Sequence, residues 1–480
     1  MDGIILRRIS NKFFPGACYS NIWLLLASAF YLTLTFAPTI SHAADLRFHS
    51  TAKAQISVAT VDENFDQHQS IKSQSTLFQV TPEITLKSEH FGKLTSLIRV
   101  KYQGNDGFRN TDVTQSSYNP NSKPYLHHDS SQLELREIYW EVPIKTHYLT
   151  VGKQQVVWGK TDGLKLLDIV NPQTFTEFIL EDFDESRIPL WAANLELSTR
   201  DNSTLQIVWI PDTTVHSLPT QSGRYAFSSP RIISMAHEEF TVVIDNPHYP
   251  PNHEKSITDY ENAIADSDYG IKYASFVLGW DISLNYLNHY DDLPAFYRAL
   301  EVVSGINQIR ISPRYERTEI IGGTATTAFG ELTFRTELAF TRNQHFIVND
   351  PASETGITHK DEFAVVLGFD WYGLSNALLS IQVFNSHVIK APDTLTRPIT
   401  DTTTTLLIQK EFFNDTLSNE IIFIHNTYDK DGLLRPKISF AYSDETDIWL
   451  GADIYYGNKA GLYGQFNNND RIVFGVEYGF

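Results

Sequence analysis

Cysteine is nearly absent from this 480-residue chain, since Cys18 is the only one, and a framework of disulfide bonds is therefore excluded. Beyond residue 43 no stretch approaches 18 consecutive apolar residues, which excludes a transmembrane helix from that part of the sequence. Aromatic residues are abundant by contrast, with 30 Phe, 23 Tyr and 8 Trp. A chain with so much apolar surface to bury is expected to fold rather than to remain disordered.

Basic residues are too few to balance the acidic ones, because 38 Lys and Arg stand against 57 Asp and Glu. Residues 1–43 hold three basic residues and one acidic residue; without them, 35 basic and 56 acidic residues remain and the net charge is −21. A chain of this charge is repelled by nucleic acid. The sequence therefore predicts no nucleic-acid partner.

The N-terminus has the three parts of a secretory signal peptide. Arg7, Arg8 and Lys12 give a positive start, residues 22–37 form an uncharged apolar run, and residues 41–43 (SHA) fit a cleavage site. We expect residues 1–43 to be removed. An uncleaved membrane anchor is the alternative, because the run is almost long enough to cross a bilayer. An exported chain whose mature part has no cysteine fits a bacterial envelope protein.

Apolar and polar residues alternate in segments of about ten along the rest of the chain. The C-terminal segment RIVFGVEYGF shows this best, because apolar residues occupy every second position: Ile472, Phe474, Val476, Tyr478 and Phe480. A chain that ends in Phe480 resembles the terminal strand that outer-membrane barrels present to their assembly machinery. That machinery is therefore an expected partner.

Eighteen such segments can be counted. They are approximately 46–61, 72–88, 93–104, 131–144, 146–158, 190–199, 203–211, 267–277, 279–290, 307–327, 331–343, 361–371, 376–387, 403–413, 416–427, 434–443, 447–457 and 470–480. Short, turn-like connections alternate with mostly long ones, of which 159–189 and 212–266 are the largest. Transmembrane β-barrels have this order, with short periplasmic turns and long extracellular loops.

We therefore predict an all-β fold, in which residues 44–480 form a transmembrane antiparallel β-barrel of about 18 strands in the bacterial outer membrane. A secreted β-helix or propeller is the alternative, but no motif repeats at a fixed period.

If the apolar face of each strand meets lipid, the opposite face lines the lumen. Eight basic residues fall on that face and are the predicted pore-lining residues: Lys53, Arg99, Lys101, Arg310, Arg314, Arg335, Arg435 and Lys437. Charged side chains that line a pore bias its selectivity. The alternative is that inward charges only pair across strands in a water-filled interior.

The connection 159–189 is too long for a simple hairpin end, and structureless loops of such length are usually functional or disordered. It carries enough apolar residues to pack, so we expect it to fold inward as a constriction or plug. Its candidate residues are Asp162, Gly163, Asp168, Pro172 and Arg187. A surface loop that covers neighbouring loops is the alternative.

A pattern of single residues runs through 149–189. It consists of V-G-K-Q at 151–154, W-G at 158–159, D-G at 162–163, then Asp168 and Pro172. This pattern resembles the signature of a mostly uncharacterised family of Gram-negative outer-membrane proteins, classed as a domain of unknown function. More remotely, the chain is similar to alginate-export barrels and substrate-specific porins. The resemblance implies a channel without a cofactor.

No catalytic motif accompanies the barrel pattern. The sequence has no G-x-S-x-G, and the segment 237–240 (HEEF) lacks the second His of a zincin helix. A catalytic triad can still assemble from scattered residues. We predict no enzyme, no metal and no cofactor. Most aromatic residues on the strands, a set that includes Trp449, are expected in the interface girdles of the barrel, with a sugar-stacking slide as the alternative.

The predicted function is an outer-membrane channel for the passive or substrate-selective passage of a small or lipid-like solute, narrowed by residues 159–189. The alternatives are a non-conducting barrel that binds a surface partner and a barrel for polysaccharide export. Membrane lipid and lipopolysaccharide are expected partners, and a periplasmic partner is left open.

Overall fold

The computed structural model describes residues 44–59, 74–89, 91–104, 117–128, 130–161, 163–199, 202–219, 223–233, 241–303, 305–350 and 352–480. Within these ranges one antiparallel sheet closes on itself, because strand β1 (Ala44–Ala59) pairs with strand β22 (Arg471–Gly479). The sheet has 19 strands, of which β4 (Leu126–His128) pairs with the first residues of β5 and stands outside the ring. The ring in the described part of the chain therefore has 18 strands, as the sequence predicts.

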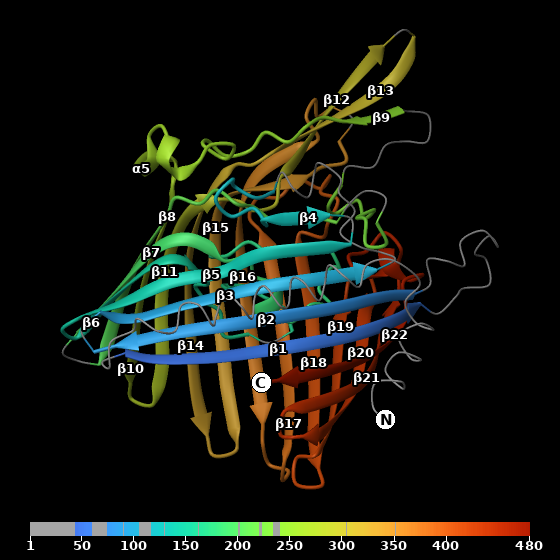
Figure 1. The fold of residues 1–480 in the computed structure, drawn as a ribbon. Helices are drawn as coiled ribbons and strands as arrows, with labels where there is room; N and C mark the ends of the chain where they lie inside the picture. The colour runs from blue at the N-terminus through green and yellow to red at the C-terminus, as the bar shows by residue number, and fades with distance from the viewer. Residues whose placement is uncertain are drawn as a thin grey trace.

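The other strands of the ring are β2 (Gln74–Ser88), β3 (Gly92–Gly104), β5 (Ser131–Ile144), β6 (His147–Gln154), β7 (Leu190–Ser198), β8 (Ser203–Ile210), β10 (Asp268–Val277), β11 (Trp280–Tyr290), β14 (Arg317–Phe329), β15 (Leu332–Ile347), β16 (Ile357–Trp371), β17 (Ala377–Val388), β18 (Thr400–Phe412), β19 (Leu417–Asn426), β20 (Asp431–Ser443) and β21 (Thr446–Tyr456). Short turns join the strands at one end of the barrel and longer segments join them at the other, as Figure 1 shows.

Helices are few and short in the described residues. They are α4 (Phe183–Ser186), α5 (Ala263–Asp266) and the 3-10 turns η3 (Ile257–Asp259) and η4 (Gly464–Phe466). None of the helices in the described ranges is long and apolar enough to cross a membrane.

The strands turn their apolar side chains outward and their polar side chains inward. On β22, Ile472 and Phe474 are 50% and 47% exposed, whereas the alternating Arg471 and Val473 are only 5% and 8% exposed. The core of this molecule therefore lies in the lumen, and the outer wall is an exposed apolar surface. Ring closure leaves no unpaired strand edge, which is the condition for a sheet in hydrocarbon, where each unpaired backbone group costs several kcal/mol.

The prediction of a single strand over residues 307–327 is wrong. The structure has two strands there, β13 (Ile306–Arg314) and β14 (Arg317–Phe329), and only β14 pairs with the ring. Strand β13 pairs with β12 (Ala295–Val303), which was expected to be loop, and with β9 (Thr241–Ile244). The alternating pattern runs through both strands without a break, so it cannot reveal that the chain enters the barrel wall only at Arg317.

The three-stranded sheet of β9, β12 and β13 projects beyond the end of the barrel that carries the long connections (Figure 1). Arg310 lies in it and forms ion pairs with Asp245 at 2.9 Å and Glu301 at 3.1 Å. Arg314 lies in the same strand, with its guanidinium 4.6 Å from the ring centre of Tyr297. Neither arginine is in the barrel wall, so their predicted place among the pore-lining residues is wrong.

Gly152 on β6 occupies a constrained backbone position in the barrel wall. Its φ is +135°, and a Cβ atom there would lie 2.2 Å from the carbonyl oxygen of Ile138 on β5. We expect Gly152→Ala to lower the free energy of unfolding by about 2 kcal/mol or more. An alanine is strained at this φ, and its Cβ atom would clash with a backbone carbonyl that the strand pairing holds in place. Urea unfolding of the refolded chain, followed by tryptophan fluorescence, measures this change.

Gly368→Ala on β16 is the matched control, because its nearest neighbour would be the Gln382 side chain at an ordinary 3.4 Å. If both variants lost the same free energy of unfolding, Gly152 would not occupy a constrained backbone position.

Candidate functional site

The connection between β6 and β7 is called the inward loop below. Its described residues, 155–161 and 163–189, lie inside the barrel. Its Phe178 packs with Ile424, Leu433 and Tyr455, which belong to β19, β20 and β21. These wall residues are buried only because something fills the lumen beside them. This long connection is therefore part of the core of the molecule. Its apolar residues allow that packing, whereas a loop on the surface would not need so many of them.

Three acidic side chains of the inward loop follow one another at intervals of four residues and meet polar side chains of the wall. Glu185 pairs with Arg99 at 2.8 Å and Glu181 pairs with Lys101 at 2.8 Å. Glu177 accepts a hydrogen bond from Gln103 at 2.9 Å. We call Glu177, Glu181 and Glu185 the acid ladder.

The spacing of the acid ladder has a geometric cause. Gln103, Lys101 and Arg99 are alternate residues of β3 and point to the same face, so they are about 6.8 Å apart along the strand. Four loop residues cover each such step, a rise of about 1.7 Å per residue, which is close to the 1.5 Å of a helix. The loop is turn-rich here and ends in α4, so its residues advance at the rate that matches the strand.

The start of the inward loop is held by β15. Glu337 accepts hydrogen bonds from the backbone N–H groups of Lys160 and of Leu167, the latter at 3.0 Å. Arg335 donates to the Lys160 carbonyl at 2.7 Å and is itself paired with Asp370 on β16 at 2.7 Å.

The two anchors lie on nearly opposite walls. Around the ring, β15 is eight strands from β3 in one direction and ten in the other. The inward loop is therefore attached at both sides of the lumen and crosses it.

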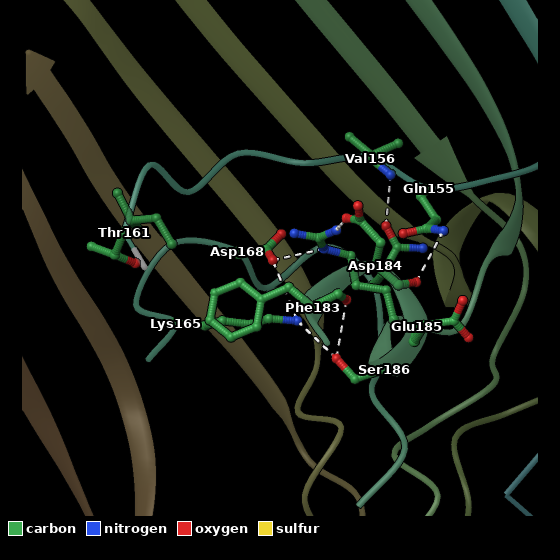
Figure 2. A network of polar contacts seen from close by, with 12 residues as sticks. Gln155, Val156, Thr161, Lys165, Asp168, Phe183, Asp184, Glu185 and Ser186 are labelled. Atoms are coloured by element: carbon green, nitrogen blue, oxygen red, sulfur yellow. Dashed lines mark hydrogen bonds and ion pairs between the residues drawn. The ribbon is translucent and has the colours of Figure 1, made fainter. Parts of the chain in front are cut away.

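The middle of the inward loop is organised by a buried ion pair (Figure 2). Arg187 donates to Asp168 at 2.7 Å, and both side chains are about 95% buried. Lys165 approaches the same carboxylate at 3.5 Å and lies 4.5 Å from the ring centre of Phe183. Burial lowers the pKa of Lys165 to about 8, although Asp168 opposes that shift.

Two residues outside the expected set fix the ends of the inward loop. Arg136 on β5 donates through Nη2 to the carbonyls of Asp184, Glu185 and Arg187, the last at 2.9 Å. Asn171 accepts from the backbone N–H of Val156 at 2.7 Å. The side-chain amide of Asn171 also donates to the Ile188 carbonyl at 3.0 Å, which closes the base of the loop.

The expected constriction residues have different local roles. Asp168 and Arg187 form the central pair, and the Pro172 carbonyl accepts the backbone N–H of Ile188 at 2.7 Å. Gly163 has a φ of +82° and lies against Thr405 of β18. Asp162 lies outside the described residues.

Six of the eight expected pore-lining residues face the lumen. Arg99, Lys101, Arg335 and Arg435 are each paired with a carboxylate, Arg435 with Asp453 at 2.8 Å. Lys53 and Lys437 instead flank Trp449, with their ammonium groups 5.4 and 5.5 Å from its ring centre. Trp449 lies over Gly475 on the inward face and is thus not one of the strand aromatics that form an interface girdle.

The acid ladder, Arg136 and Glu134 were not among the expected site residues. The four-residue spacing of Glu177, Glu181 and Glu185 is visible in the sequence, but its partners on β3 are 74 to 86 residues away. Glu134 and Arg136 alternate with Leu133 and Leu135 and could have been placed inward by the same alternation.

Among the described residues, no group of three or more His, Cys, Asp or Glu side chains is placed so that it could hold a metal ion. The inward loop and the wall contacts around it can position charge and exclude volume, and these are the properties that a channel constriction uses.

Comparisons with known proteins add a family and several similar folds. Residues 27–480 match the family model described as "Protein of unknown function (DUF1302)". No curated protein matches the chain. Acinetobacter baumannii OccAB2 is similar at 11% identity and a TM-score of 0.49, over 91% of this chain and 98% of that one.

Two further solved structures are similar over 91% of this chain and 98% of their own. They are Pseudomonas aeruginosa OccK5 (OpdH), at 9% identity and a TM-score of 0.46, and Salmonella typhi OmpF in complex with daunomycin, at 10% and 0.41. Similarities this remote say nothing about what the present chain binds.

The acid ladder predicts a dependence of stability on pH. Burial alone would raise the pKa of Glu185, but Arg99, Arg136 and Lys101 outweigh it and lower the pKa to about 2. Because the folded pKa lies below the ordinary value of 4.5, the ionised Glu185 stabilises the fold above pH 4.5. This contribution is lost as the pH falls from about 4.5 to 2.

We expect the difference in free energy of unfolding between wild type and Glu185→Gln to shrink over that window, as measured by urea unfolding at a series of pH values. A constant difference from pH 5 to pH 2 would contradict the pairing of Glu185 with the basic wall.

Proposed function

Since the chain belongs to the DUF1302 family, whose description names no activity, we propose from its geometry that it is an outer-membrane channel. A small or lipid-like solute would pass through the lumen, and the inward loop would set its width. No chemical step is part of this proposal.

The placement in the outer membrane is supported by the wall. Exposed apolar side chains cover the outside of a closed antiparallel ring, and buried polar ones cover the inside. A water-soluble protein would gain nothing from that reversal, whereas a barrel in lipid requires it. Export through a cleaved signal peptide, residues 1–43, belongs to the same proposal and falls outside the described residues.

The proposed constriction is supported by the attachment of the inward loop to both β3 and β15. Ion pairs hold one side and the Glu337 carboxylate holds the other. A segment fixed at two opposite walls must narrow the passage between them, and it cannot swing aside without breaking buried charge contacts. Breaking such a contact by removing one partner typically costs 3–5 kcal/mol.

The selectivity of the channel would come from the lysines that the wall does not neutralise. Among the described residues, no carboxylate forms an ion pair with Lys53 or Lys437, although Glu477 and Glu420 are their neighbours in register. The two ammonium groups flank Trp449 on the lumen side. We therefore expect a preference for anions there.

Deletion of residues 160–187 tests the constriction. We expect single-channel currents of the refolded wild type in a planar bilayer, and larger currents from the deletion variant, because the segment that crosses the lumen is gone. The deletion also removes the acid ladder, so the variant should be more anion-selective than wild type.

Currents from the deletion variant alone would mean that the inward loop closes the barrel until a solute or partner displaces it. Silence from both, with folding confirmed by circular dichroism, would contradict the channel and favour a barrel that only binds at the surface.

The double substitution Lys53→Gln and Lys437→Gln tests the selectivity. The reversal potential in a salt gradient is expected to move toward cation preference, because two unneutralised positive charges leave the lumen. Arg310→Gln is the matched control, since Arg310 lies outside the barrel wall. An equal shift in the control, or no shift in the double variant, would rule out this role for the two lysines.

A further inference from the structure

The segment that follows β8 contacts the inward loop, and the proposed channel gives it no role. The backbone N–H of Phe175 donates to the Ser217 carbonyl at 2.8 Å, and the N–H of Ser217 donates to the Gln173 carbonyl at 2.9 Å. Residues 215–217, which we call the clamp, thus run parallel to residues 173–175 of the inward loop and pair with them.

The clamp is itself attached to two other connections between strands. The backbone N–H of Val215 donates to the Ser117 carbonyl at 2.9 Å, and the N–H of His216 donates to the Asp292 carbonyl at 3.3 Å. The inward loop is therefore held at this point by connections outside the barrel wall, in addition to its attachment to β3 and β15.

A titratable side chain completes the clamp. The backbone N–H of Gln173 donates to Nδ1 of His216 at 2.9 Å, and the imidazole packs edge-on against Phe175 with the ring centres 5.0 Å apart. Only the neutral imidazole with its proton on Nε2 has the lone pair on Nδ1 that this bond needs. Protonation would place a hydrogen on Nδ1, so that two N–H groups would face each other and the bond could not form.

The carboxyl group closest to His216 gives a positive charge there little support. Oδ2 of Asp292 is 4.0 Å from Nδ1 of His216, which is beyond hydrogen-bond distance. Burial, Asp268 and Asp291 all raise the pKa of the Asp292 carboxyl. Acid therefore neutralises Asp292 as well, and its attraction for a protonated imidazole is lost.

The other neighbours of His216 are engaged or cationic. Asp291 attracts a proton to His216, but it already accepts a hydrogen bond from Gln344 at 2.9 Å and lies 3.6 Å from Nδ1 of His345. The remaining titratable or charged groups that face His216 or these carboxylates are Lys165 on the inward loop, His289 on β11, Asp268 on β10 and Arg317 on β14. Lys165 and His289 oppose a positive charge on His216.

We propose that His216 makes the clamp sensitive to acid: when Nδ1 takes up a proton from the medium, its bond with Gln173 breaks and residues 173–175 detach from the clamp. The inward loop keeps its contacts with β3 and β15, so the change is a local loosening on the side of the long connections. Any change of current that follows rests on the proposed channel, whereas the detachment itself does not.

The pH range of the detachment follows from the two states of His216. In the attached state burial lowers the pKa of His216 to about 4, although Asp291 opposes that shift. In the detached state the imidazole is in water and has the ordinary value of 6.5. Because the attached pKa is the lower one, the attached state loses stability as the pH falls from 6.5 to 4. Between pH 7.5 and pH 5 the ratio of detached to attached molecules rises about thirtyfold.

Hydrogen exchange of peptides that cover residues 170–178, followed by mass spectrometry on the refolded chain, measures the detachment. The test variant is His216→Asn, whose amide oxygen can accept the N–H of Gln173 at any pH. Wild type and this variant should exchange alike at pH 7.5, and at pH 5 wild type should exchange about thirtyfold faster. Comparing the two proteins at the same pH cancels the intrinsic effect of pH on exchange, and pH 5 lies above the range in which Glu185 titrates.

His147→Asn is the matched control. Nδ1 of His147 also accepts a backbone N–H, that of Ser198 at 3.1 Å, but this bond is exposed and lies at the short-turn end of the barrel. The control should exchange like wild type at both pH values. His216→Ala, which offers no acceptor, should exchange fast at both. If His216→Asn fails to fold, His216→Gln supplies an acceptor of the same kind.

Equal exchange of wild type and the folded amide variant at pH 5 would overturn the proposal. Single-channel currents of the same proteins separate it from the channel. Exchange that responds to acid in a barrel without current would contradict the channel and support the clamp. Currents together with exchange that does not respond to acid would support the channel and contradict the clamp.

Discussion

The structure depends on one constraint: a charge enclosed in the lumen must find either a partner of opposite charge or hydrogen-bonding backbone groups. Arg99 is only 6% exposed and lies between Glu134 and Glu185, and removing one partner from such a group would leave a buried, unpaired charge. The wall strands supply more basic than acidic groups on this side, so the balance comes from the inward loop. The acid ladder is therefore what determines where the loop lies, and the apolar contacts of Phe178 follow from that placement.

The same constraint explains how a loop can be as ordered as a strand. The ring fixes the spacing of inward residues on β3, because antiparallel pairing leaves no freedom of register once one face is apolar and exposed. A loop that advances at a helical rate meets this spacing every four residues, and Glu177, Glu181 and Glu185 are placed accordingly. On the opposite wall a single carboxylate, Glu337, satisfies two backbone N–H groups. The loop is thus positioned by two different chemistries, ion pairs on one side and backbone hydrogen bonds on the other.

Most of the fold could be predicted because alternation is a local property. The strand count agrees with the structure, and most strand limits lie within two residues of the predicted ones. Strand β5 agrees residue for residue, whereas one end of β6, β15 and β16 differs by four residues. The family match also agrees with the resemblance to an uncharacterised family, although the residue pattern assigned to it stays untested. Prediction failed at 307–327, where local alternation continues while the chain passes from the projecting sheet into the wall. It also missed the acid ladder and Arg136, because their partners are fixed by the closed ring and not by neighbours in sequence.

Width and charge of the proposed passage are coupled by these contacts. Every cation that the acid ladder or Asp370 and Asp453 neutralises contributes less to the electrostatic field of the lumen, whereas Lys53 and Lys437 have no ion pair among the described residues. If the inward loop moves, it uncovers Arg99 and Lys101 at the moment when it widens the lumen. An open state would therefore be both wider and more positive than the closed one. A solute that carries negative charge would then stabilise the open state by replacing the ladder carboxylates, since a ligand shifts an equilibrium only by binding one state better.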